Sequence, residues 1–240
     1  MLSNLMLDEL DRELERRGVR FTRYADDCNI YVKSKRAGQR VMHSISRFIT
    51  QKLKLKVNQA KSAVARAWER QFLGFSFTTG GKKTKRRIAA KAVAKFKQRV
   101  RELTRRSRGV SIERVVAEVT RFMQGWIGYY GYSQQPSVLQ DLESWVKRRL
   151  RCFAWVQWKT KRRRYKELRR LGVGAFAAAR TAASALGPWR LSRTPALSLR
   201  TVKCLLQQAW ITIISVADES LTSRTAVYVI RMHGGVGGRD

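Results

Sequence analysis

The sequence predicts an α+β fold: a mixed sheet with packed helices in residues 1–80, followed by an all-helical region in residues 81–170 and a basic tail in residues 171–240. Three observations favour this class. Helical and strand patterns alternate in the first eighty residues, and from residue 81 onward apolar residues recur at helical spacing. The hydrophobic fraction of 44% is that of a globular protein, and 240 residues suffice for one to two domains with cores of their own.

The first region begins with an amphipathic helix and a hairpin. Residues 3–17 are interpreted as a helix because leucine and methionine side chains recur every four residues, and Gly18 is expected to cap its C-terminus. Residues 21–32 alternate apolar and polar side chains on both sides of Ala25-Asp26-Asp27, which is typical of two strand arms joined by a tight turn.

Three further elements complete the first region. Residues 37–52 have one apolar face and predict a second helix, whereas residues 53–57 and 72–77 alternate as strands. The order helix, hairpin, helix, strand, strand predicts a mixed sheet with helices packed on one side.

Helical periodicity dominates the second region. It predicts helices at 91–106, 111–125 and 138–158, with Ser111 as the N-cap of the second. Residues 171–187 are weakly helical and 187–197 form a loop, while the last forty residues pair an apolar segment with a glycine-rich end.

Positive charge is the outlier of the composition. The chain has 51 Lys and Arg against 17 Asp and Glu, a formal net charge of +34, and 27 of the basic but only 6 of the acidic residues fall within 81–170. So much like charge repels itself unless a polyanion neutralises it, and nucleic acid is the usual partner. The middle region is therefore expected to make most phosphate contacts.

Cysteine usage and the N-terminus bear on the compartment. Cys28, Cys152 and Cys204 are far apart in sequence, and only two histidines occur, so neither a zinc site nor a disulfide framework is predicted. There is no apolar run of membrane-spanning length and no signal peptide. We expect a cytoplasmic protein without a membrane partner; the resemblance described below further implies association with the nucleoid or a ribonucleoprotein. Its oligomeric state is not predicted.

Two adjacent carboxylates, Asp26 and Asp27, lie between the apolar arms of the hairpin. One interpretation is ordinary turn chemistry, with both side chains solvated. The other is a metal site, because polymerases hold two divalent ions between carboxylates and such hard ions take oxygen ligands. Neighbouring side chains in an extended stretch point to opposite faces. The two aspartates are therefore not equivalent, and Asp26 is the candidate for the closer ligand.

The candidate nucleic-acid ligands are basic side chains in three runs of the second region. The run at 82–87 is interpreted as a linker that touches phosphate, the run at 147–151 as the basic face of a helix along a phosphate backbone, and the run at 159–170 as the densest. A solvated charged face is the second interpretation. The candidates are Lys82, Lys83, Arg86, Arg87, Lys147, Arg148, Arg149, Arg151, Lys159, Arg162 and Arg163.

An aromatic cluster at 126–132 has two interpretations. Aromatic side chains can stack on bases of a single strand, but at the end of a helix they normally fill a core. We expect packing for most of the cluster, with Tyr130 and Tyr132 as candidate exceptions.

The motifs occur in a characteristic order. They are YADD at 24–27, LKLKVNQAKS at 53–62, FLGFSF at 72–77, FMQGWIGYYGY at 122–132 and LESWVKRRLRCFAWVQWK at 142–159. With them the chain resembles the C-terminal part of a bacterial group II intron-encoded reverse transcriptase/maturase, namely half of the polymerase palm followed by the maturase-specific, thumb-like domain. The stretch at 187–197 looks like a segment near the end of many such proteins.

The resemblance implies a function. Members of this mobile-element family copy RNA into DNA, and they help the intron RNA fold for splicing. It implies that Asp26 and Asp27 are catalytic ligands of a two-metal Mg²⁺ site. It also implies that intron RNA and an RNA/DNA template-primer are the partners, with residues 88–158 holding the nucleic acid. The substrate- and primer-binding candidates are Tyr24, Ala25, Lys61, Phe72 and Gly74.

The sequence also departs from the family pattern. In the family a third aspartate and the fingers lie upstream of the hairpin, and these 240 residues contain neither. We therefore expect an N-terminally truncated family member, an incomplete metal site, no polymerase activity from this chain alone, retained RNA binding and an unpaired edge of the sheet. Two alternatives remain open: a non-catalytic RNA-binding splicing factor that acts only as a maturase, and a decayed remnant.

Overall fold

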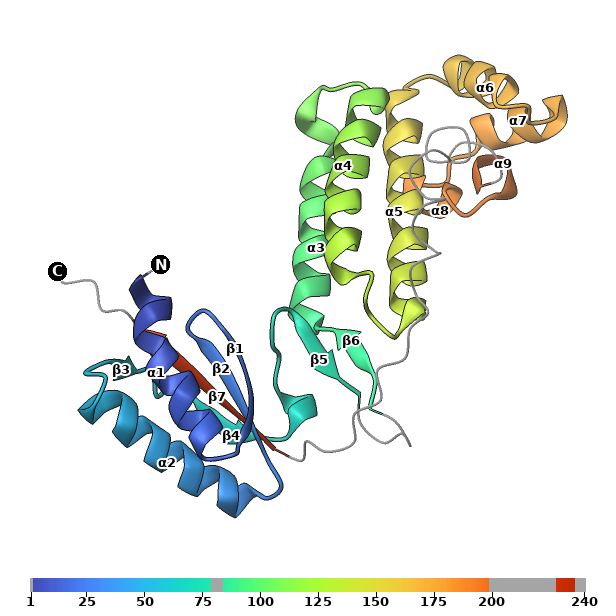
Figure 1. The fold of residues 1–240 in the computed structure, drawn as a ribbon. Helices are drawn as coiled ribbons and strands as arrows, with labels where there is room; N and C mark the ends of the chain where they lie inside the picture. The colour runs from blue at the N-terminus through green and yellow to red at the C-terminus, as the bar shows by residue number, and fades with distance from the viewer. Residues whose placement is uncertain (1, 79–83, 199–227, 236–240) are drawn as a thin grey trace. The chain divides into compact units, whose positions relative to one another are not determined.

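Figure 1 shows the computed structural model, which describes residues 2–78, 84–198 and 228–235. The chain forms two compact units, one of residues 1–85 with 221–240 and one of residues 86–220. The first unit carries a sheet with two long helices and the second is almost entirely helical, so the predicted α+β class is confirmed. The predicted domain bounds at residues 80 and 170 stay predictions.

The first unit follows the predicted order of elements, with two strands that were not predicted, β4 and, from the end of the chain, β7. Its elements are α1 (Leu2–Arg16), β1 (Arg20–Tyr24), β2 (Asp27–Val32), α2 (Lys35–Gln51), β3 (Lys56–Val57), β4 (Ala63–Ala65), a 3₁₀ turn (Ala67–Glu69), β5 (Phe75–Phe77) and β7 (Tyr228–Gly235).

The main sheet has the order β1-β2-β7-β3, with β4 also paired to β7 (Figure 1). Every pairing among these strands is antiparallel, where the sequence analysis expects a mixed sheet. β7 pairs along the whole of β2, from Asp27 opposite His233 to Val32 opposite Tyr228, so the edge strand next to β2 in this order is β1, which pairs with β2 alone. A strand some two hundred residues away in sequence leaves no local signal for this pairing.

Both long helices pack on the same face of the sheet. Cys28 and Ile30 point from β2 into a core with buried side chains of α1 and α2, which include Leu10, Leu14 and Ile45. The alternation of β2 places Asp27, Asn29 and Tyr31 on the opposite face. The period-2 pattern that predicted the hairpin therefore also determines which face carries the carboxylate.

A glycine ends α1 where the sequence predicts, and another lets α2 approach the sheet closely. Gly18 adopts a left-handed φ of 63° after α1, and the amide of Val19 donates to the carbonyl of Leu14 across the helix end. Within α2, Gly38 allows a close approach to β4, because a Cβ at this position would lie 2.6 Å from Cγ1 of Val64.

Residues 72–77 do not form the single strand that their alternation predicts. Phe72 and Phe75 exchange two backbone hydrogen bonds of 2.9 Å around Leu73 and Gly74, which both have positive φ values. This is the pattern of a tight two-residue turn, and only Phe75–Phe77 continues as β5. The expectation is wrong because the Leu-Gly turn interrupts the aromatic alternation.

The second unit begins with the short strand β6 (Arg86–Ile88), and helices follow. They are α3 (Ala90–Leu103), α4 (Ile112–Tyr130), α5 (Pro136–Gln157), α6 (Lys161–Arg170), α7 (Ala175–Ala183), α8 (Pro188–Leu191) and α9 (Pro195–Ser198), with a 3₁₀ turn at Arg106–Arg108. The three helices predicted for 91–158 are confirmed. The basic run at 159–170 is also a helix, and the predicted loop at 187–197 holds two short ones.

Helix α5 takes part in two cores. Val146 and Phe153 pack with α3 and α4 around Phe96, which is 1% exposed. Trp155, also 1% exposed, points into a second core formed with α6 to α9. A single 22-residue helix thus connects the three-helix bundle to the C-terminal helices (Figure 1). The apolar segment predicted at 209–216 lies outside the described residues.

Candidate active-site hairpin and nucleic-acid interface

The hairpin of β1 and β2 closes with a two-residue loop. Tyr24 pairs with Asp27, so Ala25 and Asp26 alone form the turn. Ala25 has a φ of 50°, a left-handed conformation that L-residues other than glycine and asparagine seldom adopt. Hairpin loops of this length require positive φ because their twist then matches that of the strands. The loop stores conformational strain of order 1 kcal/mol at its tip.

Arg23 connects this tip to α1. Its guanidinium donates to both carboxylate oxygens of Asp11 at 2.5 to 3.0 Å, to Oδ1 of Asn4 at 3.1 Å and to the carbonyl of Ala25 at 3.1 Å. The hydrogen bonds to Asp11 raise the pKa of Arg23 above its usual value. The strained loop is therefore fastened to a helix by a charge-assisted network, which the sequence analysis did not identify. An Arg on the core side of a strand, with an acidic residue on the preceding helix, is the signal that could have found it.

The two aspartates differ in their surroundings. Asp26 occupies the turn and is exposed, whereas Asp27 begins β2 and is half-buried. Next to Asp27 on the same face, Asn29 is 4% exposed, and its Oδ1 accepts no hydrogen bond. The expected inequivalence of the pair thus has a structural basis, while the assignment of Asp26 as the closer metal ligand stays a prediction.

The donors at this tip fit a hard divalent cation in kind. Asp26 and Asp27 offer carboxylate oxygens, and the unpartnered amide oxygen of Asn29 is a further oxygen donor on the same face as Asp27. The number of these oxygen ligands is small. Within residues 2–78, 84–198 and 228–235, no group of three or more His, Cys, Asp or Glu side chains is arranged to hold a metal ion.

The predicted primer-binding residues lie on three segments of the first unit. Tyr24 is 64% exposed beside the turn, and Ala25 is exposed within it. Lys61 is exposed in a turn closed by Asn58, whose Oδ1 accepts from the Lys61 amide at 3.1 Å. Phe72 and Gly74 are half-buried in the turn before β5. The roles of these five residues stay predictions.

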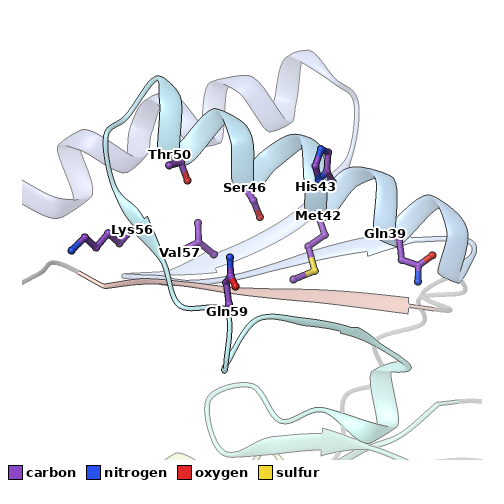
Figure 2. A pocket seen from close by; sticks show the side chains of 8 residues that line it. All are labelled: Gln39, Met42, His43, Ser46, Thr50, Lys56, Val57 and Gln59. Carbon is purple, nitrogen blue, oxygen red and sulfur yellow. The ribbon is translucent and has the colours of Figure 1, made fainter.

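An open groove of about 640 Å³ lies elsewhere on this unit, between α2 and the β3 segment (Figure 2). Figure 2 shows polar side chains of α2 facing the strand that follows it. Its lining residues are Gln39, Met42, His43, Ser46, Thr50, Lys56, Val57 and Gln59. Neither Asp26 nor Asp27 lines the groove, and its lining residues include no other carboxylate. We therefore do not assign metal binding to it.

The basic candidates of the run at 82–87 divide into different environments. Lys82 and Lys83 lie outside the described residues. The Arg86 guanidinium donates twice to the carbonyl of Tyr132, at 3.0 and 2.6 Å, and its amide donates to Oε1 of Gln134. Arg87 is exposed. The Arg86 side chain thus bonds to the protein backbone, a contact that its position in a basic run did not predict.

Most basic candidates on α5 also have partners within the protein. Lys147 forms an ion pair with Glu143. Arg148 stacks on Trp189, 3.7 Å from the ring centroid, and donates to the Trp189 carbonyl, so it joins α5 to α8. Arg151 is half-buried, its Nε has no hydrogen-bond partner, and burial lowers its pKa.

The candidates around the start of α6 are exposed to solvent. Lys159, Arg162 and Arg163 are exposed at and beyond the start of α6, whose first turn is capped by Thr160. None of the ion pairs found among the described residues includes these three side chains. They form a cationic surface that is open to a polyanion.

The aromatic cluster is mostly packed, as expected. Trp126 lies 4.5 Å from Phe96 and 4.5 Å from Tyr130, between ring centroids. Tyr132 is 61% exposed, whereas Tyr130 is half-buried, and burial raises its pKa. The role of Tyr130 and Tyr132 in contacts with bases stays a prediction. Tyr129, which is 47% exposed, was missed.

Comparison with known proteins identifies both units. Residues 1–77 match the reverse transcriptase (RNA-dependent DNA polymerase) family, and residues 93–172 match the group II intron, maturase-specific domain. No curated protein matches the chain significantly. None of the described helices has the length and apolar character needed to cross a bilayer. The two matches follow one another along the chain, and together they show that the chain belongs to the family of group II intron reverse transcriptase/maturases.

Proposed function

We propose that this chain binds the RNA of a group II intron through the basic surface of its second unit and aids the folding of that RNA for splicing. One observation carries the proposal: Lys159, Arg162 and Arg163 are exposed and form no ion pair with a carboxylate of the described residues, in a region with 27 basic and 6 acidic residues. Such a surface gains free energy when phosphates replace its counterions. A partner that is itself a polyanion satisfies this requirement directly.

For the first unit we propose a part in nucleotidyl transfer. Reverse transcriptases generally use Mg²⁺, and Asp26 and Asp27 are the residues that would hold it. A pair of such ions activates the attacking hydroxyl and stabilises the leaving phosphate. The protein contributes the strained turn that presents Asp26 to solvent, and the Arg23 network that keeps this turn in place. Tyr24 and Ala25 beside it would contact the primer end and the incoming nucleotide.

These 240 residues alone are proposed not to copy RNA. Two carboxylates at the tip, without a third carboxylate from the described residues, leave a divalent cation weakly held and poorly positioned. A primer-extension assay with Mg²⁺ and an RNA template is expected to yield no product. Template-dependent synthesis by the purified chain would contradict this part of the proposal.

The RNA-binding proposal is tested by a salt titration. Fluorescence anisotropy with a labelled intron RNA domain is expected to show affinity falling by a factor of about 10³ or more between 50 and 200 mM salt, because several phosphate contacts are lost together. Affinity that changes less than about threefold over this range would overturn it.

A purely non-catalytic splicing factor is the second candidate function. The hydrogen bond of Arg148 on α5 to the Trp189 carbonyl is compatible with both candidate functions. The variant Asp26→Ala separates them. If splicing assistance is the sole function, Asp26→Ala leaves RNA binding and splicing unchanged. If the hairpin also holds a divalent cation, the same variant abolishes Mn²⁺-induced broadening of the hairpin amide signals in NMR spectra, whereas Asp8→Ala on α1 preserves it.

A further inference from the structure

Three cationic side chains surround Trp145 in the second unit. The Lys97 ammonium lies 6.0 Å from the centroid of the indole ring, the Arg101 guanidinium carbon 5.6 Å and the Arg149 guanidinium carbon 5.7 Å. Each distance is within the range of a cation–π interaction. Among the candidates from the sequence, only Arg149 belongs to this group.

Helical spacing assembles the cluster. Lys97 and Arg101 are one turn apart on α3, and Trp145 and Arg149 are one turn apart on α5, so each pair shares a face of its helix. Trp145 is half-buried and packs against the three-helix core, which holds its ring in place. The cluster therefore rests on regular helices rather than on loops.

Arg149 is also oriented by a hydrogen bond. Its Nε donates to Oγ1 of Thr104 at 2.8 Å, and that buried hydroxyl donates to the carbonyl of Val100 at 2.6 Å. The bond uses one edge of the guanidinium and leaves its two terminal amino groups for a ligand. A preoriented guanidinium loses less conformational entropy when it binds an oxyanion.

The positive charge of the cluster is not neutralised. Two other cations of the same helices have carboxylate partners, Arg99 with Glu102 and Lys147 with Glu143. The ion pairs formed among the described residues include none of the three cations around Trp145. Burial lowers the pKa of Arg149, and the charges of Arg101 and Arg106 lower it further. The three positive charges around Trp145 thus lie close together, whereas Arg99 and Lys147 nearby are each neutralised by a carboxylate.

We propose that Lys97, Arg101 and Arg149, arranged around Trp145, form a binding site for backbone phosphate of RNA. The inference deepens the proposed RNA-binding function and rests on it. Since each cation lies no more than 6.0 Å from the same ring, any two lie at most about twice that distance apart. One phosphodiester can therefore interact with more than one of them, and Coulomb attraction at this range survives a Debye length of about 8 Å.

The role of Trp145 follows from the same geometry. Three cations already occupy the surroundings of its ring, so the indole holds the cations in position and is not a platform for a base. Recognition at this site is expected to be independent of sequence, as it is for phosphate contacts in general.

The test compares two double variants of α3 that remove the same charge. Lys97→Gln/Arg101→Gln disrupts the site. Lys95→Gln/Arg99→Gln alters two positions that lie about 200° around the helix from the site positions. Binding of a fluorescein-labelled RNA hairpin is measured by anisotropy from 50 to 300 mM salt, with two hairpins of unrelated sequence.

The site variant is expected to reduce the slope of log K against log salt by about 1 to 2 and to weaken both hairpins about tenfold or more near physiological salt. The control variant is expected to change affinity less than about threefold. The charge-preserving variant Lys97→Arg/Arg101→Lys is expected to bind within threefold of the wild type, which separates loss of charge from loss of fold.

Two results overturn the inference in distinguishable ways. Equal weakening by the site and control variants, with steep salt dependence in the wild type, refutes the site and leaves the proposed RNA binding intact. A wild-type protein without salt-dependent RNA binding refutes both. Weakening of one hairpin only would replace phosphate recognition at this site with base recognition.

Discussion

Replacement of Arg23 by glutamine is expected to loosen the hairpin of β1 and β2 without unfolding the first unit. Arg23 is the one side chain shown to donate both to α1 and to the turn that presents Asp26. Glutamine is too short and too weak a donor to replace the bidentate contact with Asp11, which leaves that carboxylate and the Ala25 carbonyl without their donor.

The magnitude follows from the burial of the pair. The side chains of Arg23 and Asp11 are 15% and 22% exposed. Removal of one partner of a fully buried ion pair costs about 3–5 kcal/mol, whereas an exposed pair contributes about 0–1 kcal/mol. For a pair that retains about a fifth of its exposure, we expect a cost of about 2 kcal/mol. This corresponds to a roughly 30-fold change in a local opening equilibrium.

Hydrogen exchange measured by mass spectrometry gives a local readout, because peptides from 20–32 report on the hairpin separately from the rest of the chain. The slowest amides of this segment are expected to exchange about 30-fold faster in Arg23→Gln. Arg20→Gln is the matched control, since it removes an exposed Arg from the same strand. Exchange within threefold of the wild type in Arg23→Gln would refute the reasoning, as would an equal effect of the control.

Three further predictions concern the cores and the sheet. Burial raises the pKa of Cys28 to about 12, so the folded state holds this proton more tightly than the unfolded chain does. The free energy of unfolding of the first unit is therefore expected to fall as the pH rises from about 9 to 12. Cys28→Ala should flatten this decline in alkaline denaturation curves, and an unchanged decline would contradict the assignment. Phe96→Ala is expected to destabilise the second unit by about 3–5 kcal/mol in urea titrations followed by tryptophan fluorescence, with a loss below 1 kcal/mol showing that the bundle core is elsewhere. A chain ended after residue 227 lacks β7, and amides of β2 to β4 should then lose protection in hydrogen exchange; retained protection would show that the sheet does not require this strand.

The fold was predictable where its causes are local. The hairpin, the first two helices and the three-helix bundle each follow from a periodic pattern with a recognisable start or end. Ser111 accepts the amide of Arg114 at the N-terminus of α4, as its position suggested, and Gly18 has the left-handed φ that a helix C-cap requires.

Long-range pairing was not predictable in the same way. The strand β7 is too far from β2 in sequence for any pattern to connect them, and its place in the sheet depends on the total number of backbone hydrogen bonds that the sheet satisfies. The turn at Leu73 and Gly74 was missed for another reason. Leucine is a poor residue for positive φ, so the alternation of aromatics on both sides outweighed the turn signal of one glycine.

For the candidate sites, the sequence predicts which residue types matter but not who their partners are. The YADD motif and hairpin periodicity together placed Asp26 in a turn, because a turn is a local property. Whether an Arg can bind RNA depends on its tertiary contacts. These contacts differ among the α5 arginines, although all of them carry the same charge. Arg148 stacks on Trp189 from α8, some forty residues later, while Arg149 lies near cations of α3.

The distribution of paired and unpaired cations gives a physical criterion for the RNA-binding surface that charge density alone does not provide. An Arg bonded to a carbonyl of its own protein loses those bonds if it turns toward a phosphate, and the exchange gains little. A cation without a carboxylate partner, held near others of its kind, gains the full Coulomb energy of the ligand and relieves repulsion as well. By this criterion the clustered side chains around Trp145 and the exposed ones at the start of α6 are expected to contribute more to affinity than Arg86 or Arg148, although all belong to equally basic stretches of the chain.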